Sequence, residues 1–263
     1  MSFLRRLMAG ISQNRAFRTQ PGARVYAVGD IHGHLDLLDN LLQQIRSDIA
    51  DNPCPAVSIV FLGDLIDRGP ASAQVVDRLL HLQDMSARCV FLAGNHEEIF
   101  LRVLAAEPGV AYDWLGFGGD NCVESYGLNP SALSVMDEQA IADLLMRTIP
   151  ARHIDFIKGF ADTVRSGDYV FVHAGIRPGI PIDQQSSHDL RWIRNEFLND
   201  GKDHGFMVIH GHTISHGVDE RVNRIGIDTG AYQTGALTAL ALEDDRRWIL
   251  TTGVRGASLP SEG

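Results

Sequence analysis

The chain has 263 residues, of which 44% are hydrophobic, so it can bury the core of one sizeable domain. Its formal charge of −10 at pH 7 excludes the general basic surface that is typical of nucleic-acid-binding proteins. No apolar run is long enough to predict a membrane span and the three cysteines show no C-x-x-C spacing, so we expect no disulfide framework, no stable membrane association and a reduced, cytoplasmic location.

Residues 1–23 are predicted to form an arm ahead of the globular domain. A helix here would carry one short apolar face, made of Phe3, Leu4, Leu7, Met8 and Ile11. Arg5 and Arg6 interrupt the apolar stretch, which is also too short for a signal-peptide core. We expect the arm to pack on its own domain or on a neighbouring subunit. A membrane-surface helix is the alternative, although a segment of this length binds weakly alone.

Three strand–helix units follow the arm. Apolar, β-branched runs predict strands, and apolar residues at helical spacing predict the helices between them. The predicted ranges are strands 24–28, 57–62 and 88–93, with helices near 34–49 and 96–105. Alternation of this kind indicates a parallel sheet.

The pattern changes after the third unit. Residues 101–162 carry several short helical stretches and are predicted to form a helical insertion over the site. Strands dominate again from Tyr169, and the last two, ALTALALE and RRWILTT, are close enough to pair as antiparallel neighbours. We therefore expect one domain over 24–252 and a frayed tail over 253–263.

Metal-binding side chains stand beside glycines at five places, each directly after an apolar run. The five motifs are GDIHG (29–33), GDLIDRGP (63–70), GNHE (94–97), VHAGI (172–176) and HGHT (210–213). Because open α/β sheets build their sites at the carboxyl ends of strands, we expect these side chains to meet there.

The residue types in the motifs predict two metal ions. Counting donors assigns one set to each ion: Asp30, His32 and Asp64, then Asp64, Asn95, His173 and His212. Carboxylates with imidazoles suit a divalent transition ion, manganese first, with iron or zinc as alternatives. Two such ions sharing a hydroxide are the usual device for in-line attack on phosphorus. His210 shares a face with His212 and is the alternative ligand.

Other polar residues of the motifs are candidates for catalysis and for binding phosphate. His96, next to ligand Asn95, can protonate the leaving oxygen, and Asp67 can keep its imidazole cationic. Arg68 can bind phosphate oxygens bidentately, with Asn95 beside it. Tyr232 is a further candidate for the site.

The ordered motifs GD-x-HG, GD-x-x-DRG and GNHE resemble the phosphoprotein phosphatase family, the binuclear metal-dependent serine/threonine phosphatases, and most closely its bacterial and bacteriophage lambda phosphatase-like branch. The resemblance covers roughly residues 24–252. It implies an α/β (α+β) metallophosphoesterase fold: two mixed β-sheets in a sandwich, flanked by helices, with the metals at one edge and the insertion as a cap.

The same resemblance implies the ligand set and the Asp67–His96 pair, and it favours His212 over His210. It also implies a second phosphate-binding arginine. The stretch DLRWIRNEF resembles the family segment that supplies this arginine, which favours Arg194 over Arg191. Arg177, just after HAGI, is another candidate.

The expected function is hydrolysis of phosphoserine or phosphothreonine in proteins and peptides. The alternative is a symmetrical diadenosine tetraphosphate hydrolase, a related group that shares GD-x-HG, GNH and HAGI. That group typically has alanine in place of Asp67 and aspartate in place of Glu97. The insertion also has few basic residues with which to hold a polyphosphate. A non-catalytic metal-binding module is disfavoured because every ligand position is filled.

Overall fold

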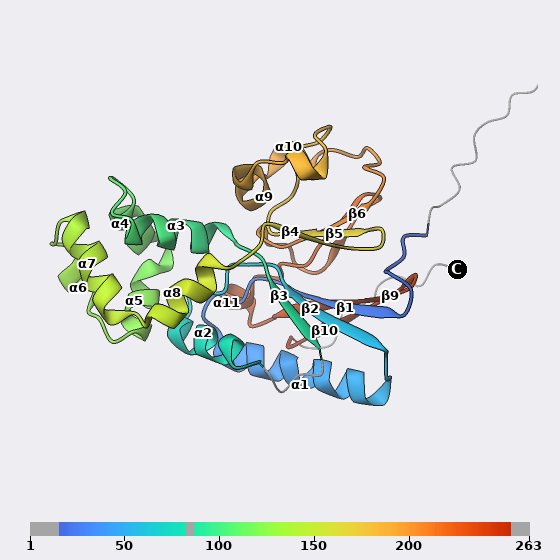
Figure 1. The fold of residues 1–263 in the computed structure, drawn as a ribbon, viewed down its shortest axis with the longest axis horizontal. Coiled ribbons are helices and arrows are strands. Elements are labelled where there is room, and N and C mark those ends of the chain that lie inside the picture. Colours follow the sequence, from blue (N-terminus) through green and yellow to red (C-terminus); the bar gives the residue numbers. More distant parts are fainter. Residues whose placement is uncertain (1–15, 83–86, 254–263) are drawn as a thin grey trace, which may run out of the picture.

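The computed structural model describes residues 16–82 and 87–253, which form two β-sheets packed face to face with helices on the outside (Figure 1). Most of the predicted arm (1–15) and nearly all of the predicted tail (254–263) lie outside the described residues. Residues 16–22 pack on the domain, where Phe17 is buried against Tyr169.

The first sheet has the strand order β10-β9-β1-β2-β3. Its strands are β1 (Ala23–Val28), β2 (Ala56–Phe61), β3 (Arg88–Phe91), β9 (Thr238–Glu243) and β10 (Arg246–Thr251). Strands β1, β2 and β3 are parallel, as the strand–helix alternation predicted, and β9 pairs antiparallel with both β1 and β10. The predicted antiparallel pairing of the last two strands is confirmed.

The second sheet has the strand order β4-β5-β6-β8-β7. Its strands are β4 (Thr163–Ser166), β5 (Tyr169–Val172), β6 (Met207–His210), β7 (Asp219–Glu220) and β8 (Arg224–Gly226). Strands β5, β6 and β8 are parallel, while β4 and β7 run antiparallel at the two edges. Both sheets are therefore mixed, which confirms the fold that the resemblance implied.

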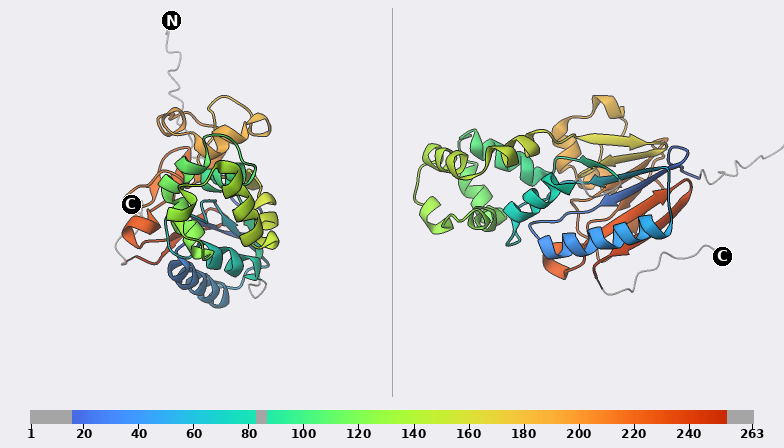
Figure 2. Two further views of the ribbon diagram at one scale, coloured as in Figure 1. Left: turned by 90° about the vertical axis from the view of Figure 1, so that its left-hand side faces the viewer. Right: turned by 60° about the horizontal axis from the view of Figure 1, so that its bottom comes forward.

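Alternating side chains along the strands create three apolar layers. On β1, Val25 and Ala27 face the second sheet, where they pack with Phe171 and Ile209. Tyr26 and Val28 face the opposite side, in the core formed with α1 (Leu35–Asp51) and α2 (Ser72–Leu80). The outer face of the second sheet is covered by α9 (Ser187–Trp192) and α10 (Asn195–Leu198) (Figures 1 and 2).

Two shorter elements are the helix α11 (Ala231–Thr234) and the 3-10 turn η3 (Ile182–Gln184). None of the helices in the described ranges is both long and apolar enough to cross a membrane.

The predicted insertion forms a helical lobe at the end of the molecule where β1, β2 and β3 finish (Figures 1 and 2). The chain enters it through α3 (Asn95–Leu104), the helix of the third strand–helix unit. The lobe contains α4 (Ala111–Trp114), α5 (Asp120–Ser125), α6 (Pro130–Leu133), α7 (Glu138–Thr148) and α8 (Ala151–Lys158), with a π-helical turn η2 (Leu115–Gly119). Its buried side chains belong to the same core as α1 and α2, so the lobe is packed onto the domain.

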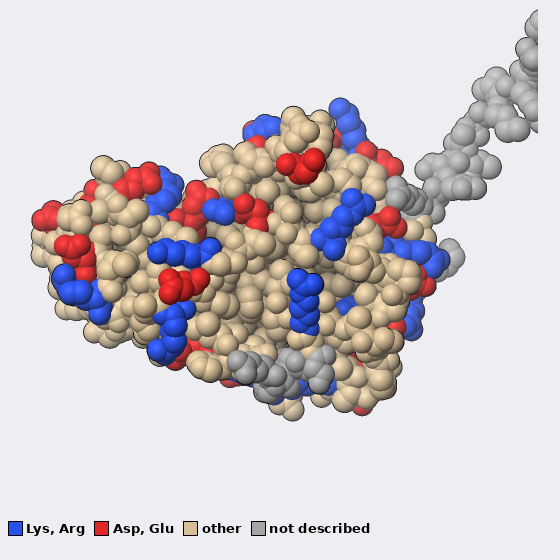
Figure 3. Space-filling model, viewed as in Figure 1, with Lys and Arg blue, Asp and Glu red and all other residues tan. Residues whose placement is uncertain are grey.

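Lysine and arginine are interspersed with aspartate and glutamate on the face shown in Figure 3. Several exposed charges of the described residues are paired, such as Arg152 with Asp77 at 3.0 Å and Arg102 with Glu107 at 2.6 Å. Exposed pairs of this kind contribute about 0–1 kcal/mol to stability. The fold is therefore held mainly by its apolar layers.

Candidate metal centre and active site

The five motifs converge at the carboxyl ends of parallel strands from both sheets. Asp30 and His32 follow β1, Asp64 follows β2, and Asn95 begins the helix after β3. His173 follows β5 and His212 follows β6. All six side chains are buried, with exposed fractions between 0 and 7%. The sandwich thus brings together residues that lie up to 182 positions apart, as Asp30 and His212 do.

Backbone strain is concentrated at this point. Seven non-glycine residues in the described ranges have a positive φ, and five of them belong to the motifs: His32, Asp64, Asp67, Arg68 and His212. Such conformations cost about 1–3 kcal/mol each and persist only where the surrounding structure enforces them. Their clustering marks the ends of β1, β2 and β6 as a functional site.

Close backbone approach is built into the loops that carry the ligands. A Cβ at Gly94 would collide with Oδ1 and the backbone nitrogen of Asp64, and one at Gly211 would collide with Oδ1 of Asp30. Glycine is therefore required against these two carboxylates, which explains the Gly-Asn pair of GNHE and the Gly-His pair of HGHT.

Asp64 lies between two sets of potential ligands. Its Oδ2 is 3.5 Å from Nε2 of His32, and its Oδ1 is 3.5 Å from Nε2 of His173. Two groups of donor atoms are close enough to hold an ion: His32, Asp64 and His96, and Asp64, His173 and His212. The carboxylate of Asp64 belongs to both groups, as the bridging position requires.

Asn95 and Asp30 complete the surroundings. Oδ1 of Asn95 is 3.0 Å from Nε2 of His173, so Asn95 joins the second group. Asp30 lies outside the two closest groups, and its carboxylate accepts the backbone N–H of His212 at 3.1 Å. Burial and the nearby carboxylates of Asp228 and Asp64 raise the pKa of Asp30 well above its usual value.

The tautomers of two histidines leave the correct nitrogen free for a metal. Nδ1 of His32 lies 2.9 Å from the carbonyl oxygen of Ile66, and Nδ1 of His173 lies 2.8 Å from that of Leu62. A carbonyl only accepts hydrogen bonds, so each Nδ1 carries the proton and each Nε2 presents its lone pair toward Asp64.

The electrostatics of the site also fit bound cations. Burial lowers the pKa of His32 to about 3 and that of His212 to about 2, so both rings are neutral. Neutral imidazoles and buried carboxylates are donors for a divalent transition ion. Carboxylates buried at this density are costly unless a positive charge compensates them. The residues present therefore fit two such ions.

His210 does not join this cluster. Its Nδ1 lies 3.1 Å from the carbonyl oxygen of Gly211 and its Nε2 lies 3.4 Å from a nitrogen of Arg224. The ring packs against Phe197, on the outer side of the second sheet. Of the two histidines, His212 is the one beside Asp64.

His96 and Asp67 form a tight buried pair. Nδ1 of His96 is 2.6 Å from Oδ2 of Asp67, and the two residues are 2% and 0% exposed. Burial alone would lower the pKa of His96, but the carboxylates of Asp64 and Asp67 outweigh it and raise the pKa to about 8. The same Asp67 oxygen accepts the indole N–H of Trp114 at 2.9 Å, a partner that the sequence motifs did not indicate.

Arg68 lies over the site next to this pair. Its Nη2 is 3.1 Å from Nε2 of His96, and its guanidinium stacks 4.5 Å from the ring centre of Tyr232. The ring of Tyr232 also meets His32 edge-on at 5.2 Å. Tyr232 thus reaches the site, where its ring packs against the guanidinium of Arg68.

The three candidates for a second phosphate-binding arginine differ in their partners. Arg177 is bound to Asp189 at 2.5 Å, and Arg191 is bound to Asp162 at 2.6 Å and to Glu98 at 3.2 Å. Arg194 is exposed and donates one hydrogen bond, 3.3 Å long, to Thr213. Its positive charge contributes to lowering the pKa of His212 and His173, where burial is the largest cause. Arg194 is therefore both near the ligands and free of carboxylate partners.

Asp228 is a site residue that the sequence reasoning missed. It follows β8, is 4% exposed and accepts the N–H of Gly230 at 2.9 Å. Burial raises its pKa to about 6, and Asp64 adds to the effect. The stretch IGIDTG carried the same signal as the five motifs, an apolar run followed by Asp and Gly, and it could have been found on that basis.

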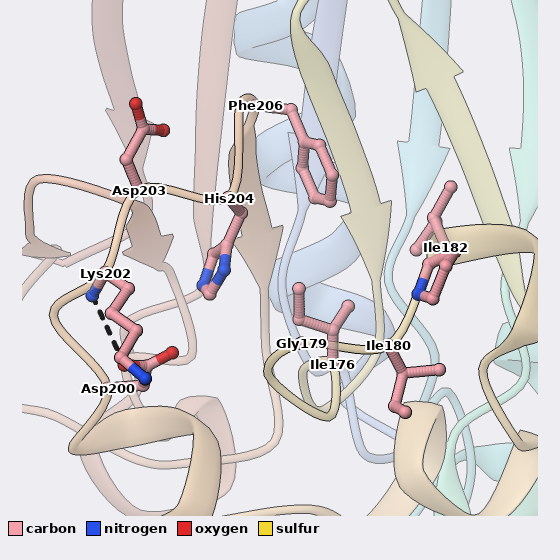
Figure 4. Close-up of a pocket in the computed structure, with 10 residues that line it drawn as sticks. Ile176, Gly179, Ile180, Ile182, Asp200, Lys202, Asp203, His204 and Phe206 are labelled. Atoms are coloured by element: carbon pink, nitrogen blue, oxygen red, sulfur yellow. Dashed lines mark hydrogen bonds between the residues drawn. The ribbon is translucent and has the colours of Figure 1, made fainter.

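A separate pocket of about 300 Å³ lies on the outer side of the second sheet (Figure 4). Ile176, Ile182 and Phe206 form its apolar side, and Asp200 and His204 lie opposite. None of the predicted site residues lines it. The pocket therefore takes no part in the chemistry of the metal centre.

Comparison with known proteins agrees with this geometry. Residues 23–247 match the family model described as Calcineurin-like phosphoesterase. The chain is 30% identical to serine/threonine-protein phosphatase 2 of Escherichia coli, over 81% of this chain and 90% of that protein. It is 37% identical to a symmetrical bis(5'-nucleosyl)-tetraphosphatase of Thioalkalivibrio sulfidiphilus, over 33% of this chain and 28% of that protein. A solved structure named "putative diadenosine tetraphosphatase" has the same fold over 92% of this chain and 100% of its own, with a TM-score of 0.61 and 22% identity.

Proposed function

The chain belongs to the calcineurin-like phosphoesterases and is a metal-dependent phosphoester hydrolase; on that premise we propose that it acts as a serine/threonine protein phosphatase. Its substrates would be phosphorylated proteins or peptides. The observation that carries this proposal is the buried Asp67–His96 pair, 2.6 Å apart, at the edge of the ligand cluster.

Two divalent transition-metal ions, manganese by preference, would be held by the ligands: Asp30, His32 and Asp64 for one, and Asp64, Asn95, His173 and His212 for the other. The chemistry that such ions supply when bound is Lewis-acid stabilisation of negative charge on the phosphoryl oxygens.

The chain's own residues would hold the phosphate and move the proton. Arg68 and Arg194 would bind the phosphoryl oxygens by charge-assisted hydrogen bonds, and the Asn95 side chain would bind them as well. His96 would donate its Nε2 proton to the leaving oxygen of the serine or threonine. Asp67 would hold Nδ1–H of His96, which keeps the ring oriented and stabilises its cationic form.

Two further observations support a monoester substrate. This chain has Asp67, paired with His96, at the position where the tetraphosphatase group typically has alanine. The alignment with the Escherichia coli phosphatase spans 90% of that protein, whereas the alignment with the tetraphosphatase spans 28% of the latter. The chain therefore resembles this phosphatase over most of the phosphatase's length, and this tetraphosphatase over less than a third of the tetraphosphatase's length.

A symmetrical diadenosine tetraphosphate hydrolase is the second candidate, favoured by the shared fold of the structure of that name. A diadenosine tetraphosphate would need several cationic partners along its bridge and two surfaces for its bases. The site offers Arg68 and Arg194 as cations close to the ligands. We therefore place the monoester first.

The thiols of Cys54, Cys89 and Cys122 form no disulfide in the described residues, which supports a reducing compartment such as the cytoplasm as the place where this activity would operate. The substrate class is tested by a panel of phosphoserine and phosphothreonine peptides, p-nitrophenyl phosphate and diadenosine tetraphosphate, each with Mn²⁺, Fe²⁺ and Zn²⁺. Preferential hydrolysis of the peptides is expected with Mn²⁺, and preference for the dinucleotide would promote the second candidate.

A further inference from the structure

We propose that Trp114, in the helical insertion, is a positioning residue for the Asp67–His96 pair: its indole N–H fixes the Asp67 carboxylate in the orientation that His96 needs. The proposal rests on the proposed function, since it gives a role to a residue that acts through the same pair.

One oxygen of Asp67 receives two donors. Oδ2 accepts Nδ1–H of His96 at 2.6 Å and Nε1–H of Trp114 at 2.9 Å. Asp67 is 0% exposed, so water cannot replace a donor that is lost. Because both bonds end on the same oxygen, the indole determines how the carboxylate plane faces the imidazole. Removing it would leave the carboxylate free to turn away from His96.

The indole is itself held rigidly. Trp114 is 0% exposed, lies at the end of α4 and packs against Phe100 with ring centroids 5.9 Å apart. A Cβ at Gly119 would collide with the indole ring, so only glycine fits there. The close approach is made by η2, the π-helical turn that breaks helical geometry at Phe117 and Gly118.

The same turn holds the residue after Asp67. The carbonyl oxygen of Gly118 accepts the backbone N–H of Arg68 at 2.9 Å. Asp67 and Arg68 have φ values of 71° and 67°, a left-handed conformation that neighbouring contacts must enforce. The insertion therefore forms hydrogen bonds with two consecutive residues of the DRG motif, with the side chain of Asp67 and with the backbone of Arg68.

This arrangement predicts a specific kinetic defect. The indole N–H of Trp114 is donated to Asp67, which is not a predicted metal ligand. Its loss should weaken proton donation to the leaving oxygen and leave binding of substrate and metal intact. A leaving group of low pKa needs little protonation and should be affected least.

The test compares Trp114→Phe with wild type on a phosphoserine peptide and on p-nitrophenyl phosphate. A hydrogen bond to a buried charged group corresponds to roughly a 10- to 100-fold change in rate, so kcat for the peptide should fall by that factor. KM and metal content should not change, and kcat for the aryl phosphate should fall much less. The matched control is Phe100→Leu, which perturbs the same aromatic contact without touching Asp67 and should not distinguish the two substrates.

Equal losses on both substrates, or the same substrate dependence in Phe100→Leu, would overturn the proposal. A second measurement needs no substrate: the exchange of the Trp114 indole proton with solvent, followed by NMR and assigned with Trp114→Phe. Exchange should be slow in the wild type and roughly tenfold or more faster in Asp67→Ala, because a hydrogen bond to the carboxylate is lost. The indole of Trp248, which donates to Asp48 at 3.2 Å, is the internal control.

The exchange result separates this proposal from the proposed function. Unchanged exchange in Asp67→Ala would refute the positioning role whatever the substrate is. Faster exchange in an enzyme that hydrolyses p-nitrophenyl phosphate but no phosphopeptide would support the positioning role and refute the phosphoprotein substrate.

Discussion

The Glu97 carboxylate reaches from the first turn of α3 to the backbone of Asp64, with Oε2 2.9 Å from the Asp64 nitrogen. The same oxygen accepts the N–H of Gly94 at 2.9 Å, and Oε1 accepts that of Leu65 at 2.8 Å. Glu97 thus joins the loop after β2 to the loop after β3 by three buried hydrogen bonds. It fixes the strained backbone of Asp64, whose carboxylate lies between the two groups of ligands.

Glu97→Asp should destabilise the protein by about 1–3 kcal/mol, because a side chain one methylene shorter cannot reach all three N–H groups and leaves a buried donor unpaired. Metal affinity should fall with it, since Asp64 loses its support. Thermal unfolding and metal titration measure the two effects. Glu124→Asp, on the exposed surface of α5, is the control and should change neither. A fully stable Glu97→Asp protein would show that the bridge is dispensable.

Removal of metal should abolish turnover, and manganese should restore it best. Asp64→Asn should be the most damaging single ligand change, because Asp64 faces His32 through one oxygen and His173 through the other. Metal content measured by mass spectrometry should drop for both ions together, while the exposed control Asp183→Asn keeps both. Full activity after chelation and gel filtration would contradict the two-metal assignment.

His96→Asn should retain both metals and lose roughly 10²–10⁴-fold in kcat on a phosphopeptide, the usual range for a lost general acid. The pKa of His96 is raised to about 8, so the acid form predominates below that pH and kcat should decline as the pH rises through it. The variant should lack this decline. Asp67→Asn should give a milder version of the same defect. Equal losses on alkyl and aryl phosphates would argue against His96 as the acid.

Arg194→Ala should raise KM for a phosphopeptide by roughly tenfold or more, because one charge-assisted hydrogen bond to phosphate is lost. The melting temperature should not fall. Arg191→Ala should lower the melting temperature and leave KM unchanged, because Arg191 pairs with both Asp162 and Glu98 in a half-buried network. Comparing KM and thermal unfolding for the two variants checks the assignment. An unchanged KM in Arg194→Ala would remove it from the phosphate site.

Much of the site could be predicted from the sequence because each ligand follows a strand directly. The short spacing in GD-x-HG or GNHE fixes where Asp30, His32 and Asn95 lie once the strands are placed, and β1, β2 and β3 were evident from their apolar runs. The antiparallel pairing of β9 and β10 followed from the short connection between them.

Contacts that depend on packing between distant segments could not be predicted. Trp114 meets Asp67 across 47 positions, and no spacing in the sequence relates a helical insertion to the DRG motif. The sequence favours Arg194 over Arg191 by resemblance alone, because the ion pairs that Arg191 forms with Asp162 and Glu98 join segments far apart in the chain. Asp228 is different, since the sequence carries its signal, an apolar run followed by Asp and Gly.

Whether the buried Asp67–His96 pair serves hydrolysis of a phosphomonoester is decided by one comparison: kcat/KM for a phosphoserine peptide and for diadenosine tetraphosphate, measured on one manganese-loaded preparation of the wild-type enzyme. The peptide should be strongly preferred, and this preference should shrink in Asp67→Asn, which weakens the acid that an alkyl leaving group needs. A strong preference of the wild-type enzyme for diadenosine tetraphosphate would refute the phosphomonoester assignment.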